Sequence, residues 1–274
     1  MTETMESASP TACSTTLANL QPLVDGDILL YRCGFAADSQ VKKQLKQQDP
    51  SLTDGDLAHL LEEMDYKNIA LHNAKQVLVH VAELFDGSSM RVFLTGDGNF
   101  REQIATLLPY KGNRDPTHKP KYYKEIKQYL IEVWGAEIVH GQEADDALGI
   151  AQYERNDEST VIVSVDKDLD MIPGHHYNFV RKEYYYISQQ YADTRLFWQM
   201  LVGDTTDNIP GINGIGDKRA DKIVAQCKGD VDALRYVVKE KYRDQYGAFW
   251  EDAYNEVGNL LWIRREAEQD CPLL

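Results

Sequence analysis

The chain has 274 residues, of which 43% are hydrophobic and 27% are charged, a composition typical of a globular protein with one sizeable core. No apolar run approaches the roughly 18 residues that span a bilayer, and the four cysteines lack CxxC spacing. We therefore expect no membrane segment, no disulfide framework and no zinc site, and a cytoplasmic location. The net charge of −15 argues against indiscriminate binding to polyanions, so any nucleic-acid contact must depend on local charge.

The first half of the chain is predicted to alternate between strands and helices. Residues 1–21 are polar and acidic, and we expect a disordered leader there. The β-prone run 22–31 predicts a buried strand interrupted by carboxylates, and 54–86 predicts one or two helices. A second strand is expected over 90–95 and a helix near 99–108.

The second half continues this alternation and then becomes helical. Further strands are predicted over short β-prone runs: 136–140, 160–165, 177–181 and 183–187. A helix is expected to open at Glu143, and helices dominate after residue 190. The alternation predicts an α/β fold with a mostly parallel sheet over 22–188 and a helical region over 189–274.

Acidic side chains follow four of the predicted strands. They are Asp25 with Asp27, Asp97, Glu143 with Asp145 and Asp146, and Asp166 with Asp168. The carboxyl ends of parallel strands meet at one edge of a sheet, where so many carboxylates would repel one another without a cation. Their oxygens suit Mg²⁺ or Mn²⁺, and a further pair, Asp204 and Asp207, could complete a second metal position. The pattern favours metal-dependent phosphodiester chemistry, whereas the alternative for each Asp is a helix cap or turn residue.

The most basic stretch of this acidic protein lies between residues 110 and 128. Its basic side chains are Lys111, Arg114, Lys119, Lys121, Lys124 and Lys127, and three tyrosines (Tyr110, Tyr122 and Tyr123) are interleaved with them. Cations neutralise phosphates and tyrosines stack on unpaired bases, so the stretch indicates nucleic-acid contact. The alternative is a solvated helix face. Its position directly after the Asp97 segment favours the contact.

A glycine-rich segment over 209–220 predicts a hairpin loop that enters a helix. Gly214 and Gly216 allow the backbone to approach a phosphate closely, and the helix N-terminus supplies amides. Lys218 and its basic neighbours add positive charge. The segment indicates sequence-independent duplex binding, with an ordinary helix–helix turn as the alternative.

These motifs occur together in a known order. The chain contains, in sequence, VDGDILLYR, GDGNFR, YKGNR, EADD, SVDKDLD and GDTTDNIPGINGIGDKRA. Over roughly residues 22–230 it resembles the 5′-nuclease superfamily, which includes flap endonucleases, the 5′-exonuclease domain of bacterial DNA polymerase I and small bacteriophage 5′–3′ exonucleases. Its compact size is most similar to that of the phage enzymes.

The resemblance implies a fold and a set of site residues. The fold would be a PIN-like (Rossmann-like) core over 22–188 with a basic arch or gateway at about 108–130, followed by a helix-three-turn-helix element at about 203–228. The first metal site would comprise Asp25, Asp97, Glu143, Asp145 and Asp146, and the second Asp166, Asp168, Asp204 and Asp207. Lys111 and Arg114 would contact the phosphate that is cleaved. Asp27 lies outside this ligand set and is expected to support it. The expected DNA contacts are Arg101, Tyr110, Lys119, Lys121, Gly214, Gly216 and Lys218.

The implied function is a 5′–3′ exonuclease or 5′-flap endonuclease with two Mg²⁺ ions, replaceable by Mn²⁺, and K⁺ at the glycine hairpin. Expected substrates are DNA with 5′ ends or flaps and RNA primers on DNA, in phage replication or host DNA degradation. We expect a monomer in the host cytoplasm, with replication proteins as partners and no membrane. Two alternatives stay open: an inert structure-specific DNA-binding protein, and a haloacid dehalogenase-type phosphatase in which the pairs Asp25/Asp27 and Asp204/Asp207 carry the chemistry.

Overall fold

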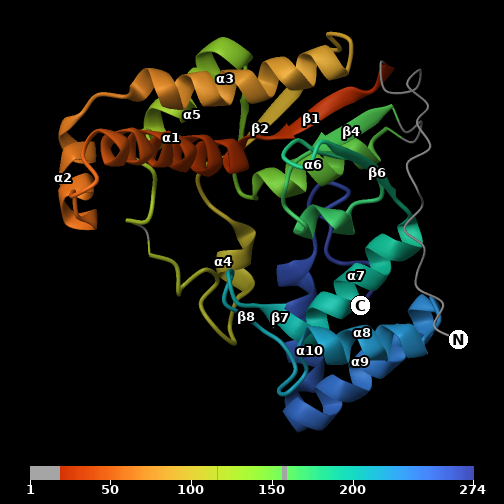
Figure 1. The fold of residues 1–274 in the computed structure, drawn as a ribbon. Helices are drawn as coiled ribbons and strands as arrows, with labels where there is room; N and C mark the ends of the chain where they lie inside the picture. The colour runs from red at the N-terminus through yellow and green to blue at the C-terminus, as the bar shows by residue number, and fades with distance from the viewer. Residues whose placement is uncertain (1–18, 116, 156–158) are drawn as a thin grey trace, which may run out of the picture.

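A six-stranded sheet forms the centre of the molecule (Figure 1). The computed structural model describes residues 19–115, 117–155 and 159–274. The strands are β1 (Gln21–Asp25), β2 (Arg91–Thr95), β3 (Glu137–Val139), β4 (Thr160–Val163), β5 (Gly174–Asn178) and β6 (Glu183–Ile187). Their order is β3-β2-β1-β4-β5-β6, in which every neighbouring pair is parallel except the antiparallel pair β5–β6. The predicted mostly parallel α/β sheet is therefore confirmed.

The central strands are buried on both faces. Val24 of β1 and Val163 of β4 pack into the first of two hydrophobic cores, whereas the preceding residues along the same strands, Leu23 and Ile162, pack into the second. This alternation follows from the two-residue period of a strand. The sheet therefore separates two cores, one on each face.

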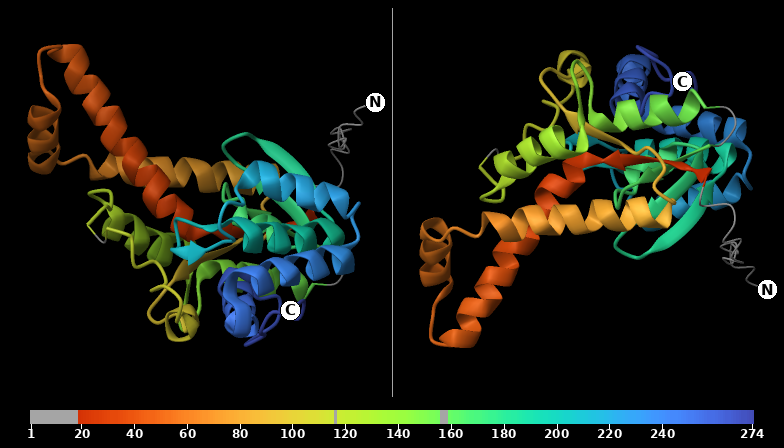
Figure 2. Two further views of the ribbon diagram at one scale, coloured as in Figure 1. Left: turned by 90° about the horizontal axis from the view of Figure 1, so that it is seen from below. Right: turned by 90° about the horizontal axis from the view of Figure 1, so that it is seen from above.

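Helices cover both faces of the sheet (Figures 1 and 2). The first core receives side chains of α1 (Gly26–Gln48), α2 (Asp54–Glu63), α3 (Lys67–Leu84) and α5 (Tyr123–Trp134). The second receives side chains of α6 (Ala144–Tyr153), α7 (Gln189–Val202), α8 (Asp217–Gln226), α9 (Val231–Tyr246) and α10 (Trp250–Leu261). The short elements are α4 (Phe100–Ile104), the 3₁₀ helices η2 (Asp168–Met171) and η3 (Gly247–Phe249), and the antiparallel pair β7 (Gly203–Asp204) and β8 (Ile209–Pro210).

Two segments extend from this layered body. The far end of α1, with α2 and the start of α3, projects away from the sheet (Figure 2). The second segment is the connection between α4 and α5, which spans residues 105–122 and carries Lys111 and Arg114. Among the described residues we find no helix of the length and hydropathy needed to cross a bilayer.

The predicted strand over 22–31 is wrong after Asp25. The Asp25 carboxylate accepts a hydrogen bond from the Ile28 amide at 3.1 Å and caps α1, so the apolar run that follows is helical. Leu29 and Leu30 are both buried on that helix, and a short apolar run does not distinguish a buried helix from a strand. Residues 1–18 of the predicted leader lie outside the described residues, and Gln21 already pairs with Thr160 in the sheet.

Two other boundaries differ from the prediction. The helix expected near 99–108 is only the short α4, because Ala105 is extended and ends it. The strand expected over 177–181 is β5, which begins at Gly174, three residues earlier. Its start was not predicted because His175 and His176 are polar and do not continue the apolar pattern of the strand.

Candidate active site

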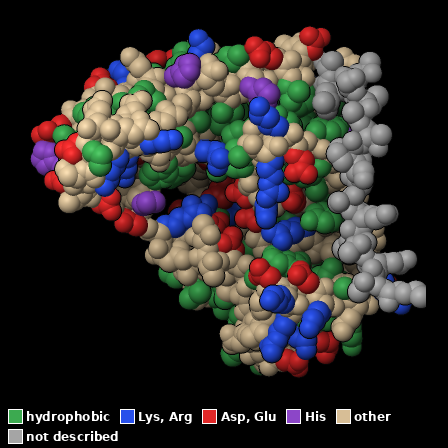
Figure 3. Space-filling model, in the orientation of Figure 1, with side chains coloured by type: hydrophobic (Ala, Val, Ile, Leu, Met, Phe, Trp, Pro, Cys, Tyr) green, Lys and Arg blue, Asp and Glu red, His purple; other side chains and the backbone are tan. Residues whose placement is uncertain are grey.

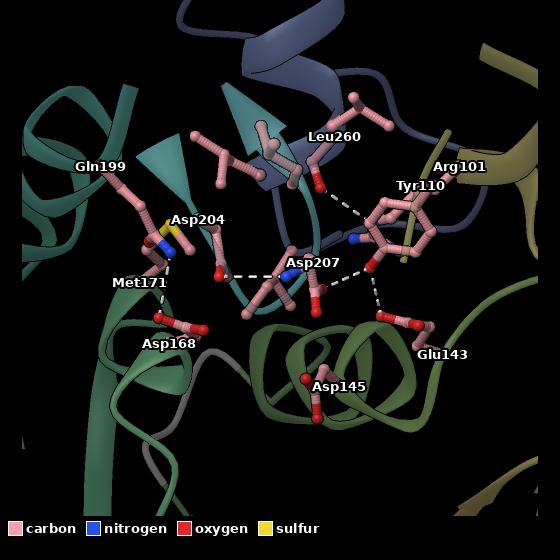
Figure 4. Close-up of a pocket in the computed structure, with 13 residues that line it drawn as sticks. Arg101, Tyr110, Glu143, Asp145, Asp168, Met171, Gln199, Asp204, Asp207 and Leu260 are labelled. Carbon is pink, nitrogen blue, oxygen red and sulfur yellow. Dashed lines mark hydrogen bonds between the residues drawn. The ribbon is translucent and has the colours of Figure 1, made fainter. Parts of the chain in front are cut away.

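Five carboxylates from three segments face a small hollow at the carboxyl ends of the parallel strands (Figure 4). The cavity has a volume of about 30 Å³, enough for one or two waters or ions. Its acidic lining residues are Glu143, Asp145, Asp168, Asp204 and Asp207. Figure 3 shows the hollowed face, where acidic and basic side chains meet between the upper and lower parts of the molecule.

Asp25 and Asp145 lie deepest in this acidic cluster. Burial, together with the nearby charges of Asp27 and Asp166, raises the pKa of Asp25 to about 7, although the hydrogen bond from the Ser164 hydroxyl at 2.7 Å opposes the shift. Burial also raises the pKa of Asp145 well above its usual value, as do the charges of Asp25 and Asp166. The carboxylates that follow β1 and β4 and that open α6 are therefore electrostatic neighbours, as their places after the strands predict.

Asp168 joins this cluster to the loop after α7. Burial raises the pKa of Asp168 to about 6, with further contributions from the charges of Asp166 and Asp204. Gln199 donates a hydrogen bond to Asp168 at 3.1 Å, and Arg195 lies 3.7 Å from it. Gln199 and Arg195 could not be predicted as site residues, because they lie on a helix about thirty residues after Asp168 and belong to no recognisable motif.

Lys111 and Arg114 meet the opposite wall of the hollow. The Lys111 ammonium pairs with Glu143 and lies 3.6 Å from Asp207, and the Arg114 guanidinium pairs with Asp207. The Tyr110 hydroxyl lies 3.0 Å from Glu143 and 2.8 Å from Asp207. The basic pair thus stands against the acidic cluster, and Tyr110 lines the hollow rather than lying on open surface.

Arg101 and Asp146 have to be reassigned. Arg101 is only 2% exposed, and its guanidinium makes a two-bond contact with the fully buried Asp146 at 2.6 and 2.9 Å. The same guanidinium donates to the carbonyl oxygens of Leu260 and Trp262. Because both charges are sealed in the core, the predicted DNA contact of Arg101 and the predicted metal contact of Asp146 are wrong. The pair instead fastens α6 to the end of α10.

Lys121 is also occupied within the protein. Its ammonium donates to the carbonyl oxygens of Leu61, Glu62 and Met64, each at 2.7 Å, at the C-terminal end of α2. A cation there satisfies carbonyl groups that a helix end leaves without partners. The predicted DNA contact is therefore replaced by a structural one.

The remaining predicted residues lie on the surface or beside the cluster. Asp97 is exposed in the loop after β2, where its amide donates to His140. Asp27 accepts two 3.2 Å hydrogen bonds from the Thr95 amide, and burial raises its pKa. Lys119, Gly214, Gly216 and Lys218 are exposed, and Gly214 has a left-handed φ of 74°.

The donor chemistry of the cluster fits a hard divalent cation. Its oxygens come from carboxylates whose pKa values are raised by mutual repulsion and burial, and a bound cation would remove that repulsion. Within residues 19–115, 117–155 and 159–274, however, no three His, Cys, Asp or Glu side chains are already gathered closely enough to hold a metal ion. The carboxylates surround the hollow without forming a closed cage.

Comparison with known proteins gives a consistent result, although no protein-family model matches the chain. It is 31% identical over 185 residues to the thermostable DNA polymerase I of Thermus aquaticus, which covers 60% of this chain and 21% of that protein. It is 27% identical over 217 residues to a 5′-3′ exonuclease of Buchnera aphidicola, which covers 72% of this chain and 67% of that protein. A 5′-3′ exonuclease of Bacillus subtilis is 25% identical over 270 residues, covering 91% and 82%. The resemblance to the 5′-nuclease superfamily is confirmed.

Solved structures of 5′ nucleases share the fold. The T5 D15 protein co-crystallised with metal ions aligns with a TM-score of 0.51 at 16% identity, covering 88% of this chain and 99% of that one. Human GEN1 in complex with Holliday junction DNA aligns with a TM-score of 0.50 at 11% identity, covering 92% and 63%. At such identities the likeness concerns the fold alone. The chain spans about a fifth of the length of the DNA polymerase I relatives, 21% of the one from Thermus aquaticus.

The buried ion pair is expected to contribute strongly to stability. Arg101→Met should lower the free energy of unfolding by about 3 to 5 kcal/mol, because it leaves the Asp146 carboxylate buried without a counter-charge. Urea unfolding measures the effect, with Lys119→Met at an exposed position as the control that should change little. An Arg101→Met protein as stable as the control would contradict the assignment.

Lys121 is expected to support the fold and not to bind DNA, whereas Lys119, two residues earlier, is exposed and free to reach DNA. Lys121→Met should destabilise the protein by about 1 kcal/mol, because the Leu61 and Glu62 carbonyl groups lose the Lys121 donor while Met64 keeps the Tyr122 hydroxyl, and should leave DNA affinity unchanged. Denaturant unfolding and fluorescence anisotropy with a labelled duplex separate the two effects. A loss of affinity in Lys121→Met without loss of stability would restore Lys121 as a DNA contact.

Proposed function

We propose that the protein is a metal-dependent 5′ nuclease that hydrolyses phosphodiester bonds at the 5′ ends or flaps of DNA. The observation that carries this proposal is the meeting of the acidic cluster with Lys111 and Arg114 at one hollow. Carboxylates suit a divalent cation, and an ammonium and a guanidinium suit a phosphate. The names of the relatives, 5′-3′ exonuclease and DNA polymerase I, support the reaction class.

Two Mg²⁺ ions, replaceable by Mn²⁺, are the proposed cofactors. Asp25, Glu143 and Asp145 would hold the first ion, with Asp97 from the exposed loop. Asp166, Asp168, Asp204 and Asp207 would hold the second. When bound, such ions supply charge neutralisation and Lewis-acid activation at a phosphate. Ser164 orients Asp25 and Gln199 orients Asp168, so these two side chains fix the direction of the carboxylates.

Lys111 and Arg114 supply positive charge next to the scissile phosphate. In the present structure their partners are Glu143 and Asp207, two of the carboxylates that line the hollow. Negative charge develops on the phosphate oxygens during hydrolysis, and fixed cations stabilise it most when water is excluded. The planar guanidinium can contact two oxygens at once, whereas the ammonium acts as a point charge.

The glycine segment and α8 form the proposed duplex contact. Gly214 and Gly216 lie exposed just before α8, whose first turn carries Lys218. Free backbone amides, a bound K⁺ and the lysine would hold phosphates without reading the sequence. We place the catalytic core in residues 22–188, including an arch at 108–130, and the duplex-binding element at 203–228 of the helical region 189–274. Exposed Lys119 extends this contact along the arch. Tyr110 orients Glu143 and Asp207, because its hydroxyl lies within hydrogen-bonding distance of both carboxylates.

The proposal also covers the setting in which the nuclease acts. We infer a monomer that works in a cytoplasm, the host's if a phage encodes it, with replication proteins nearby. RNA primers paired to DNA fall within the substrate class. Such a nuclease would serve phage replication or degrade host DNA.

Cleavage of two 5′-labelled substrates, a blunt duplex and a single-flap junction, tests the function. We expect short labelled products with Mg²⁺ and none with EDTA, and Asp145→Asn should abolish cleavage while still binding DNA, because one ligand charge is lost. Asp252→Asn, the same change at an exposed position on α10, is the matched control and should cleave at the wild-type rate. DNA binding without cleavage of either substrate would instead indicate an inert DNA-binding protein. Hydrolysis of p-nitrophenyl phosphate alone would indicate a phosphatase.

Lys111→Ala is expected to slow cleavage by about 10²-fold or more, because a fixed charge next to the phosphate is removed. The affinity for the duplex should change little, since many phosphates share that interaction. Single-turnover rates and anisotropy measure the two quantities separately. If affinity falls and the rate at saturation does not, Lys111 only attracts DNA and takes no part in the reaction.

A further inference from the structure

The connection between α4 and α5 is held at several points, although its described residues, 105–115 and 117–122, form no helix or strand. Its beginning is fixed to α10, because the Glu256 carboxylate accepts hydrogen bonds from the amides of Thr106 at 2.8 Å and Leu107 at 2.7 Å. The Thr106 hydroxyl donates to the same carboxylate. These hydrogen bonds fix the first residues of the connection after α4 against α10 (Figure 1).

The basic part of this connection then runs along the loop 205–208 between β7 and β8. Two asparagine side chains join the two segments: Asn208 donates to the Pro109 carbonyl oxygen at 2.8 Å, and Asn113 donates to the Thr205 carbonyl oxygen at 2.6 Å. Between them, the Lys111 amide donates to the Asp207 carbonyl oxygen at 2.8 Å. We call these three hydrogen bonds the asparagine clamp.

The clamp holds Lys111 in a backbone conformation that it would not favour alone. Lys111 has a φ of 54°, in the left-handed region, where a residue other than glycine or asparagine loses about 1 kcal/mol or more. Asn208 has a φ of 59°, which asparagine tolerates. The clamp thus fixes the point from which the Lys111 and Arg114 side chains leave the backbone.

The other side of the loop 205–208 is equally well fixed. Asp204 accepts hydrogen bonds from the amides of Thr206 at 2.7 Å and Asp207 at 3.2 Å, and β7 pairs with β8. The chain then enters the glycine segment, where the Ile212 amide donates to the Leu201 carbonyl oxygen at the end of α7. One short loop therefore connects the basic pair, the acidic cluster and the glycine segment.

We propose that Asn208 and Asn113 are positioning residues that set Lys111 and Arg114 against the scissile phosphate. This inference rests on the proposed nuclease function. Neither asparagine touches the substrate in this account, and each acts through the backbone of residues 109–114. A duplex held at the glycine segment would then meet the two cations in one fixed register, because the loop 205–208 belongs to both sites.

Asn208→Gly is the deciding variant, because glycine keeps the left-handed backbone and removes only the side-chain donor. We expect the single-turnover cleavage rate to fall about tenfold or more and the duplex dissociation constant to change by less than about threefold. Asn68→Asp, at an exposed position on α3, is the control for an asparagine change elsewhere and should cleave at the wild-type rate. Asn113→Ala should reproduce the loss, and it decides the matter if Asn208→Gly does not fold.

A double-mutant cycle with Lys111→Ala separates positioning from a general structural effect. If Asn208 acts through Lys111 and Arg114, Asn208→Gly should slow the wild type more than it slows Lys111→Ala, in which only the Arg114 contribution is left to lose. Equal losses in both backgrounds, or a wild-type rate in both asparagine variants, would overturn the proposal.

Hydrogen exchange keeps this test independent of the proposed function. Asn208→Gly should raise the exchange of the Lys111 amide relative to Asn68→Asp, because the clamp bond to Asp207 opens more often. Unchanged exchange would overturn the clamp whether or not the protein cleaves DNA. If the wild-type protein leaves every DNA substrate intact while exchange rises as expected, the nuclease function fails and the clamp stands.

Discussion

The buried carboxylates at the strand ends carry an electrostatic cost that the surrounding elements have to offset. Asp25, Asp145 and Asp168 come from three different elements, and each has a raised pKa because it is buried from water and, in addition, because its neighbours are acidic. Such a cluster destabilises a fold unless positive charge is brought to it. Lys111 and Arg114, on the connection after α4, bring positive charge to the neighbouring carboxylates Glu143 and Asp207.

This arrangement explains why a long connection is held so firmly. Residues 105–122 would carry a large entropic cost if their cations had to find the hollow from a mobile loop. Glu256 fixes the start of the connection, and the asparagine clamp fixes the part that carries Lys111. The helical region is therefore joined to the site, and the buried pair Arg101–Asp146 ties the end of α10 to the helix that bears Asp145.

The architecture and the position of the site follow from the sequence because both depend on local patterns. Alternating strands and helices imply a parallel sheet, and a parallel sheet gathers the acids that follow its strands at one edge. Boundaries were less predictable: the residues after Asp25 are apolar enough for a strand, and only the cap and packing against the sheet make them helical.

The errors in the site share one physical cause. Arg101 and Lys121 are basic residues near basic motifs, and their sequence neighbours do not reveal the partners that hold them. Asp146 lies 45 positions from Arg101, and the carbonyl groups that bind Lys121 lie about 60 positions away. The asparagine clamp could not be predicted for the same reason, since it joins segments more than 90 residues apart. Contacts of this kind can be predicted only once the fold is known, whereas carboxylates at strand ends can be predicted from the sequence pattern alone.

Counting bound Mn²⁺ by electron paramagnetic resonance shows whether the acidic cluster binds divalent cations. We expect about two ions bound per chain in the absence of DNA. Asp166→Asn, which removes a charge that acts on Asp25, Asp145 and Asp168, should weaken this binding. A wild-type protein that leaves all Mn²⁺ free at millimolar concentration would refute cation binding by the cluster.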